Sequence, residues 1–252
     1  MVYDGLWCSF NDCHMIELAQ YTAEKAKLTR EELDRFSAES QRKAADAIAS
    51  CRFSKEIAAV TIPQRKGDPI VISKDESVRG DSTAETLAKL APVTKDRGGM
   101  ITAGNAPGLN DGGAAVVLMS GERVRERGAK PIARVVAYAT GGGDPKDLFF
   151  APIDAVEKLM KKMGVAIGHF DLIEANEAFA AQALADGNAL GWDWERVNVN
   201  GGAVALGHPI GASGARVLVT LIHALEQRGK TTGLATLCLG GGNAVALAVE
   251  RV

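Results

Sequence analysis

The sequence predicts an α/β protein whose second half is a mostly parallel sheet covered by helices. In residues 131–252, candidate strands and helices alternate in the order βαβαβαββ, and such alternation favours parallel strands with helical crossovers. Only Gly240-Gly241-Gly242 separates the last two strands, which is too short for a crossover, so that pair must run antiparallel. Residues 112–119 also resemble residues 241–248, since both are glycine-led and apolar. This repeat arises either by chance or from a fold built of two similar halves.

The first half predicts less regular structure. Residues 1–108 are mostly polar, with a capping box at Thr29 and Glu32 that opens a helix with an apolar stripe. Residues 60–62 and 70–72 are expected to form a hairpin around a glycine. Residues 109–130 then predict one strand and one helix, which would close an earlier half of a two-part fold.

In the second half, the expected helices and strands follow from hydrophobic periodicity and from proline and glycine positions. Pro152 marks the first turn of one helix. The expected elements, in chain order, are a strand over 132–139, a helix from 152, a strand over 171–175, a helix over 177–190, a strand over 197–199, a helix within 211–228, and strands over 234–239 and 244–250.

Composition narrows the classes of function. The 252 residues include 29 basic and 31 acidic side chains, a balance that favours neither a nucleic-acid partner nor a membrane surface. No apolar run approaches the ~20 residues of a membrane helix, and the start carries no signal peptide. The four cysteines form no C-x-x-C pair, so we expect no metal site, reduced thiols and a cytoplasmic location.

Three polar residues follow candidate strands or open candidate helices. Asn176 comes after the strand over 171–175, His208 lies in a Gly-His-Pro turn before a helix, and Cys238 ends a strand before three glycines. Ligands of open α/β sheets usually bind at the carboxyl ends of the strands. Glycines at such a place let backbone N–H groups approach a reacting oxygen. The three residues are therefore candidates for one catalytic site.

Each candidate also has a purely structural interpretation. Asn176 could serve only as a helix N-cap, His208 could be a turn residue, and Cys238 could be a small buried apolar side chain. Other enzyme classes fit less well, because the glycines lack the G-x-G-x-x-G spacing of a dinucleotide site and no G-x-S-x-G hydrolase motif is present.

Three ordered motifs carry a more specific resemblance. Asn176-Glu177-Ala178-Phe179-Ala180 is similar to the N-E-A-F-A motif of thiolases, residues 198–216 resemble the long thiolase signature around Gly-His-Pro, and residues 238–242 resemble the C-x-G-G-G motif. The resemblance implies a thiolase fold of five αβαβα layers built from two similar halves. Residues 1–108 would be the loop domain that holds coenzyme A, residues 109–130 the remnant of the N-terminal half, and residues 131–252 the complete C-terminal half.

The resemblance also implies an activity. Thiolases are acyltransferases that condense two acetyl-CoA molecules into acetoacetyl-CoA, or cleave it, with coenzyme A as substrate and no permanently bound cofactor. By similarity, Cys238 would be the acid/base at the reacting carbon and His208 would activate a nucleophilic cysteine. Asn176 would hold a water in one oxyanion hole, and the N–H of Gly240 would serve a second.

The residues implied in substrate binding are scattered along the chain. Arg79 would meet the nucleotide end of coenzyme A, although a solvated surface charge is an equally simple interpretation. The pantetheine and acyl region would be lined by Leu6, His14, Met15, Leu109, Ala178 and Phe179. Pro107 replaces a serine that is common in the family and cannot supply its hydroxyl.

One family feature has no counterpart in these residues. Thiolases carry the nucleophile in a C-[GS]-S-G-like segment, and no such segment occurs in this sequence. We therefore expect an N-terminally truncated thiolase, in which the strand around 114–119 is left exposed. The alternative is a catalytically inactive chain that only binds coenzyme A or pairs with a second chain supplying the N-terminal half. The resemblance further implies a homo-oligomer for the full-length family.

Overall fold

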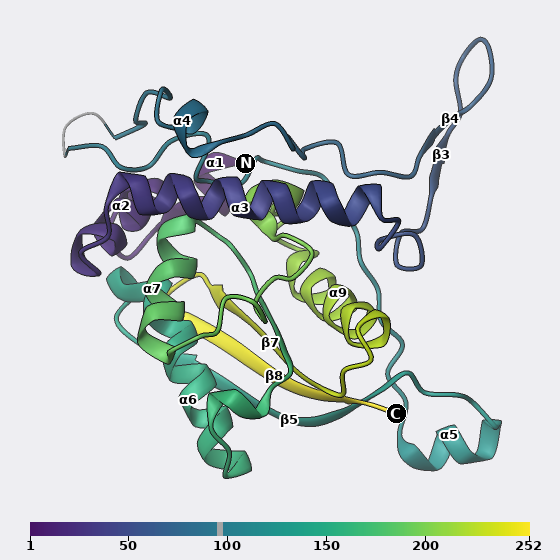
Figure 1. Cartoon of the computed structure of the whole chain (residues 1–252). Helices are drawn as coiled ribbons and strands as arrows, with labels where there is room; N and C mark the ends of the chain where they lie inside the picture. The colour runs from purple at the N-terminus through teal and green to yellow at the C-terminus, as the bar shows by residue number, and fades with distance from the viewer. Residues whose placement is uncertain (95–97) are drawn as a thin grey trace.

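The computed structural model describes residues 1–94 and 98–252, which fold into a layered α/β structure (Figure 1). Its main sheet has four strands in the order β5-β8-β7-β6. Two short hairpins, β1–β2 and β3–β4, lie outside that sheet. The elements, in chain order, are α1 (Val2–Gly5), β1 (Trp7–Cys8), β2 (Cys13–His14), α2 (Met15–Lys25), α3 (Arg30–Ala49), β3 (Val60–Ile62), β4 (Ile70–Ile72), α4 (Ala84–Leu87), α5 (Gly121–Arg127), β5 (Ala133–Gly142), η2 (Pro145–Phe150), α6 (Ala151–Met163), η3 (Ile167–His169), β6 (Leu172–Ala175), α7 (Ala180–Leu190), α8 (Ala203–Leu206), α9 (Ser213–Gln227), β7 (Thr232–Leu239) and β8 (Asn243–Arg251).

The expectation of a mostly parallel sheet is wrong in one respect. Strands β5, β6 and β7 do run in the same direction, but only β6 and β7 pair in parallel. The final strand, β8, turns back after β7 and lies between β7 and β5, so both of its pairings are antiparallel. The crossovers therefore set the direction of three strands as predicted, while the terminal hairpin decides which strands become neighbours.

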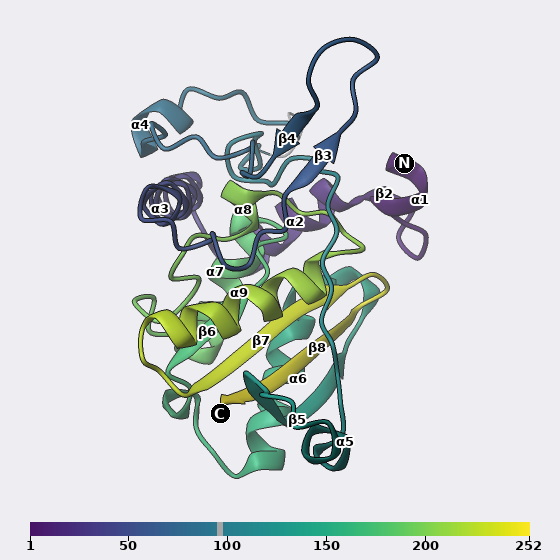
Figure 2. The same cartoon turned by 90° about the vertical axis from the view of Figure 1, so that its right-hand side faces the viewer.

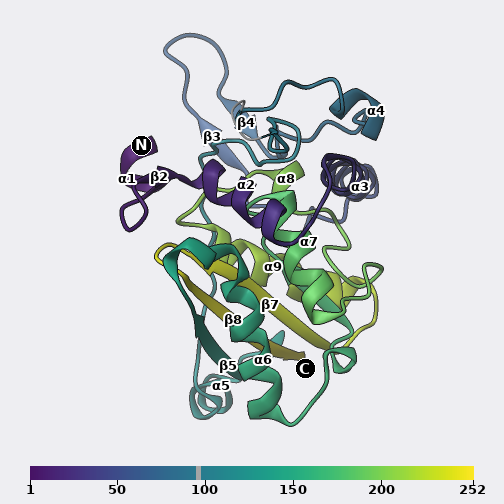
Figure 3. The same ribbon diagram turned by 90° about the vertical axis from the view of Figure 1, so that its left-hand side faces the viewer.

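Helices cover both faces of this sheet. Successive residues of a strand point to opposite faces, and Ile173 and Leu234 accordingly join the apolar cluster beneath α6. Their neighbours Leu172 and Ala235 join the cluster beneath α9. Figures 2 and 3, seen from opposite sides, place α9 in front of the sheet in one view and α6 in the other.

The N-terminal region lies across one end of this layered core. The long helix α3 begins at the predicted capping box, where Thr29 accepts a hydrogen bond from the Glu32 N–H and the Glu32 carboxylate accepts one from the Thr29 N–H. Buried residues of α3 face α7 and α8. The predicted hairpin over residues 60–62 and 70–72 also forms, with Gly67 in a left-handed conformation at its turn. Figure 1 shows this hairpin projecting away from the rest of the molecule.

Two predicted strands do not form. Residues 197–199 make only single bridges, because Asn198 has a φ of 45° and its side chain bonds to the backbone of Ala175 instead. Residues 114–119 find no neighbouring strand among the described residues and run as an extended segment that leads into α5 (Figure 2). Val117 is 89% exposed and Leu118 76%. The predicted exposure of this apolar segment is therefore confirmed, and its strand structure is not.

Candidate active site

The parallel pairing of β6 and β7 brings two of the candidate residues to one edge of the sheet. Asn176 directly follows β6, and its backbone N–H donates to the carbonyl oxygen of Thr236 in β7 at 3.0 Å. Cys238 lies two residues further along β7, and Gly240 follows at the exposed turn into β8. A side chain at Gly240 would meet no atom within 4 Å, so the space beside this turn is open. The carboxyl ends of β6 and β7 thus form the floor of the candidate site.

His208 reaches the same edge from a glycine turn. Gly207 ends the short helix α8 with a φ of 97°, a conformation that favours glycine. A Cβ at Gly207 would also lie 2.4 Å from the side chain of Asn110, so the position needs glycine for space as well. The turn places His208 Nε2 3.3 Å from Asn176 Nδ2. The structure therefore brings Asn176 and His208 into direct contact.

The hydroxyl of Ser213 determines which ring nitrogen of His208 carries the proton. Ser213 Oγ donates its single proton to the carbonyl oxygen of Pro209 at 3.0 Å, and the same Oγ lies 2.6 Å from His208 Nδ1. Asn176 Nδ2 carries only N–H donors and lies against Nε2, so the ring proton is assigned to Nδ1 and Oγ accepts from it. Nε2 then carries a lone pair, which accepts from the Asn176 amide. His208 is consequently arranged as a base at Nε2.

Burial, and secondarily nearby charges, keep both titrating groups of the site neutral. Burial, together with the positive charge of Arg216, lowers the pKa of His208 to about 4. Burial, together with the nearby carboxyl of Asp186, raises the pKa of Cys238 to about 12. At neutral pH the site holds an imidazole that can accept a proton and a thiol that can donate one.

Replacement of Ser213 with alanine is expected to release the ring of His208 from a single tautomer. The Nδ1–H loses its acceptor, so we expect a mixture of tautomers and a loss of about 1–2 kcal/mol in the free energy of unfolding. Two-bond ¹H–¹⁵N spectra of the histidine rings would record the tautomers. Ser54→Ala is the matched control, since Ser54 Oγ also donates to a carbonyl three residues earlier, that of Cys51. An unchanged His208 ring spectrum in Ser213→Ala would contradict the assignment.

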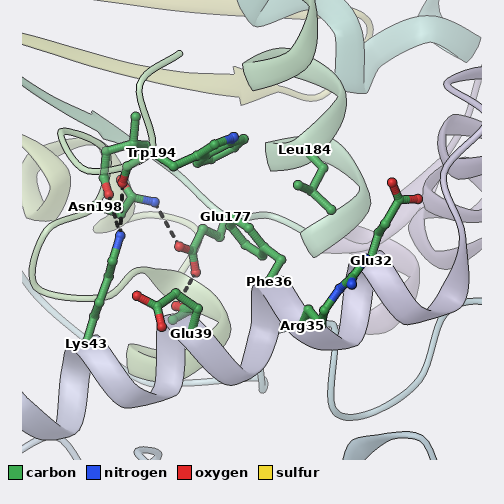
Figure 4. A pocket seen from close by; sticks show the side chains of 11 residues that line it. Glu32, Arg35, Phe36, Glu39, Lys43, Glu177, Leu184, Trp194 and Asn198 are labelled. Atoms are coloured by element: carbon green, nitrogen blue, oxygen red, sulfur yellow. Dashed lines mark hydrogen bonds between the residues drawn. The ribbon is translucent and has the colours of Figure 1, made fainter. Parts of the chain in front are cut away.

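The buried carboxylate of Glu177, the residue after Asn176, holds three separate segments together. Glu177 is 1% exposed and accepts hydrogen bonds from Ser40 Oγ at 2.7 Å, Asn198 Nδ2 at 2.8 Å and the Val204 N–H at 3.0 Å. A Cβ at Gly202 would meet the Glu177 carboxyl group at 2.2 Å, so only glycine allows the chain to pass. Figure 4 shows Glu177 between Asn198 and helix α3, beside a cavity of about 320 Å³. The carboxylate therefore ties α3 to the loop that leads to His208.

The predicted substrate-binding residues fall into three groups. Leu6 and Met15 are joined by a backbone hydrogen bond of 2.9 Å, and His14 is the N-cap of α2, its Nδ1 accepting from the Ile16 N–H. These three residues are half-buried. They lie in and beside the hairpin β1–β2, next to α2.

The second group, Ala178 and Phe179, is buried, and the ring of Phe179 meets that of Phe149 edge to face at 5.3 Å. The third group, Arg79 and Leu109, is exposed. The only hydrogen bond described for Arg79 runs from its backbone N–H to Gln41 Oε1 at 2.7 Å. Leu109 is 58% exposed and lines no cavity described here.

Sequence reasoning missed the positioning roles of Ser213 and Glu177. Glu177 lies in the N-E-A-F-A motif and Ser213 in the long signature over residues 198–216. The only sequence signal for Glu177 is its place next to Asn176, and the only one for Ser213 is its place at the start of a predicted helix. Their partners lie up to 137 residues away in sequence, as for Ser40 and Glu177. Within residues 1–94 and 98–252, no three His, Cys, Asp or Glu side chains are grouped so that they could hold a metal ion. The helices described in those ranges are too short or too polar to cross a membrane.

This chain is similar in sequence to known proteins over its whole length. Residues 129–251 match the thiolase C-terminal domain and residues 1–122 match the thiolase N-terminal domain. The chain is 54% identical over 252 residues to an acetyl-CoA acetyltransferase of Thiocystis violacea, covering all of this chain and 64% of that relative. It is 50% identical to an acetyl-CoA acetyltransferase of Escherichia coli K12, covering 99% of this chain and 63% of that protein.

Solved structures agree. The acetyl-CoA acetyltransferase of Bacillus anthracis superposes with a TM-score of 0.95 at 46% identity, over 98% of this chain and 62% of that one. Human mitochondrial 3-ketoacyl-CoA thiolase superposes with a TM-score of 0.91 at 35% identity. This chain thus spans less than two thirds of the length of these relatives. Its two domain matches and its thiolase fold show that the chain belongs to the thiolase family.

Proposed function

We propose that this chain supplies the acid–base part of a thiolase active site, which condenses two acetyl-CoA molecules or cleaves acetoacetyl-CoA. The observation that supports this most directly is the contact of Asn176 with His208 at the edge of the sheet that also carries Cys238. The relatives from Thiocystis violacea, Escherichia coli K12 and Bacillus anthracis are named acetyl-CoA acetyltransferases, which favours the same reaction. Coenzyme A esters are the proposed substrates, and residues 1–108 are the proposed loop domain that binds them.

His208 would take the proton from a nucleophilic cysteine. Its neutral ring, with the lone pair at Nε2, is the form required for that transfer, and a pKa of about 4 keeps it unprotonated at neutral pH. Once protonated, Nε2–H could donate to the oxygen of the bound thioester. The Asn176 amide beside it would supply further hydrogen bonding to the same oxygen, through a water molecule.

Cys238 suits the role of acid in the cleavage direction. Cleavage of acetoacetyl-CoA leaves a carbanion next to the thioester carbonyl, and this carbanion must gain a proton. A thiol whose pKa is raised to about 12 by burial is protonated and ready to donate at neutral pH. In condensation the same sulfur would remove that proton, which requires the substrate-loaded site to stabilise the thiolate. The N–H of Gly240 would stabilise the developing enolate oxygen.

The nucleophilic cysteine is proposed to come from residues outside this sequence. Cys8 and Cys13 face each other in the hairpin β1–β2, and Cys51 is exposed after α3. The sheet also leaves apolar surface uncovered. Tyr138 of β5 is 64% exposed, and an apolar groove beside α9 is lined by half-buried residues such as Leu218 and Leu247.

The apolar part of the sheet that α9 leaves uncovered, together with residues 114–119, supports the proposal that a further segment packs there. That segment could belong to a longer form of the same polypeptide or to a second chain supplying the N-terminal half of the thiolase fold. Burial of such apolar surface would stabilise the assembled protein.

An activity assay tests this proposal in two steps. The purified 252-residue protein is expected to release no acetyl-CoA from acetoacetyl-CoA and coenzyme A, because the covalent nucleophile is absent. The same protein joined to a segment that carries C-[GS]-S-G is expected to release acetyl-CoA. In that assembled enzyme, Cys238→Ala is expected to slow exchange of the acetyl methyl protons by about 10²–10⁴-fold. Cleavage by the 252 residues alone would refute the claim that the nucleophile lies outside this sequence. An exchange rate unaffected by Cys238→Ala would refute the acid/base role of Cys238.

A further inference from the structure

Two cysteines face each other across the short hairpin β1–β2. Cys8 is the register partner of Cys13, and the ladder continues with the hydrogen bond between the Met15 N–H and the Leu6 carbonyl at 2.9 Å. Directly opposed residues of an antiparallel pair have Cα atoms about 4.5–5.5 Å apart. A disulfide spans about 4.4–6.8 Å between Cα atoms. The backbone therefore already holds Cys8 and Cys13 at a distance that a disulfide can bridge.

The surroundings of the two sulfurs differ in access. Both side chains contact one apolar cluster that also contains Leu18 and Phe149, so they leave the hairpin on the same side. Cys8 is 3% exposed, whereas Cys13 is half-buried. A reagent dissolved in water therefore reaches Cys13 first. Asn11 Nδ2 donates to Cys8 Sγ at 3.3 Å, which holds the inner sulfur in a fixed position.

We infer that Cys8 and Cys13 form a reversible disulfide when an oxidised low-molecular-weight thiol, such as glutathione disulfide, is present. The Cys13 thiolate attacks one sulfur of the glutathione disulfide, forms a mixed disulfide and releases one glutathione. The Cys8 thiolate then attacks the Cys13 sulfur, so that the bond between the two protein sulfurs forms as the second glutathione leaves. The protein loses two electrons and two protons, and both glutathione molecules leave reduced.

The hairpin is in contact with the candidate active site. Its loop carries Phe10, whose ring would lie 3.3 Å from a Cβ at Gly241, the residue after Gly240. Figures 2 and 3 both show the hairpin on the side of the molecule where β7 turns into β8. A disulfide between Cys8 and Cys13 would close the two strands that hold this loop. Oxidation would thus act on a segment that meets the glycine turn at Gly241.

The remaining cysteines lack this arrangement. Cys51 is exposed after the end of α3, and Cys238 lies opposite Ala244 in the main sheet. Neither is paired in register with another cysteine in the described strands. We therefore expect a disulfide only between Cys8 and Cys13, and the alkylation of Cys51 and Cys238 serves as an internal reference.

Peptide mapping tests the inference without any assay of catalysis. The protein is incubated with glutathione disulfide, blocked with iodoacetamide and digested with trypsin. Cys8 and Cys13 fall on one tryptic peptide, residues 1–25, which contains no Lys or Arg before Lys25. This peptide is expected to lose the mass of two hydrogen atoms and to take up no iodoacetamide. Treatment with dithiothreitol before blocking is expected to restore two alkylation sites.

Two variants make the outcome decisive. In Cys8→Ser the resolving thiol is gone, so residues 1–25 are expected to retain one glutathionyl group on Cys13. In Cys51→Ser the oxidation of residues 1–25 is expected to be unchanged. The inference is overturned if the wild-type peptide is still alkylated at both cysteines after oxidation. It is equally overturned if the wild-type peptide retains glutathione as Cys8→Ser does.

Discussion

Replacement of Glu177 with alanine is expected to lower the free energy of unfolding by about 3–5 kcal/mol. The change leaves three buried donors without an acceptor, namely Ser40 Oγ–H, Asn198 Nδ2–H and the Val204 N–H. Each unsatisfied buried donor costs about 1–3 kcal/mol. Burial raises the pKa of Glu177 despite these hydrogen bonds, so relief from burying the carboxylate offsets part of the loss.

Urea unfolding at neutral pH would measure this change. Glu31→Ala is the control, since Glu31 lies in α3 with its side chain 76% exposed and is expected to alter stability by no more than about 0.5 kcal/mol. Glu177→Gln preserves the shape but only one acceptor oxygen, and an intermediate loss is expected. A loss below about 1 kcal/mol in Glu177→Ala would show that the network does not hold α3 to the loop before His208.

Replacement of His208 with glutamine is expected to reduce cleavage of acetoacetyl-CoA by about 10²–10⁴-fold in the thiolase that also carries its nucleophilic segment. Glutamine can hydrogen-bond to a thioester oxygen but cannot take a proton from a thiol. The comparison with Asn176→Ala separates the roles, because loss of one oxyanion donor should cost about 10²–10³-fold without changing the pH profile.

The pH dependence of His208 provides a second readout. Its pKa is about 4 in the folded protein, below the value of about 6.5 expected in the unfolded chain. The folded state therefore binds this proton less readily, and His208 lowers stability as the pH falls from about 6.5 towards 4. His208→Gln should remove that part of the pH dependence of unfolding. A ring titration centred near pH 6.5 in the folded protein, seen by NMR, would contradict the neutral, buried imidazole.

Local sequence signals predicted much of the second half of the fold. Pro152 lies in the first turn of α6, as predicted, and the left-handed C-cap at Gly164, which was not predicted, ends that helix. The three-glycine turn predicted the antiparallel hairpin β7–β8. The position of β8 between β7 and β5 depends on pairing between strands far apart in sequence, so no local pattern could reveal it. Residues 197–199 have β-branched character, but the positive φ of Asn198 is set by a bond to Ala175.

In the candidate site, too, local motifs predicted the positions of residues in the chain, but not the properties that depend on distant contacts. Motifs placed Asn176, His208 and Cys238 at the ends of strands or the starts of helices, and the structure brings the first two into contact. The pKa of Cys238 could not be foreseen, because it depends on burial and on Asp186, which lies in helix α7, far from strand β7 in sequence. The tautomer of His208 depends on its contacts with Ser213 Oγ and Asn176 Nδ2, which only the folded chain brings together.

The inner place of β8 has a consequence for how this polypeptide matures on the ribosome. Strand β5 is made more than a hundred residues before Asn243–Arg251, the one described strand with which it pairs. The strand that joins β5 to β7 is therefore synthesised long after β5, and pairings so distant in sequence form slowly. Until then, the apolar surfaces of α6 and α9 face an incomplete partner. Nascent chains would depend on chaperones during this interval.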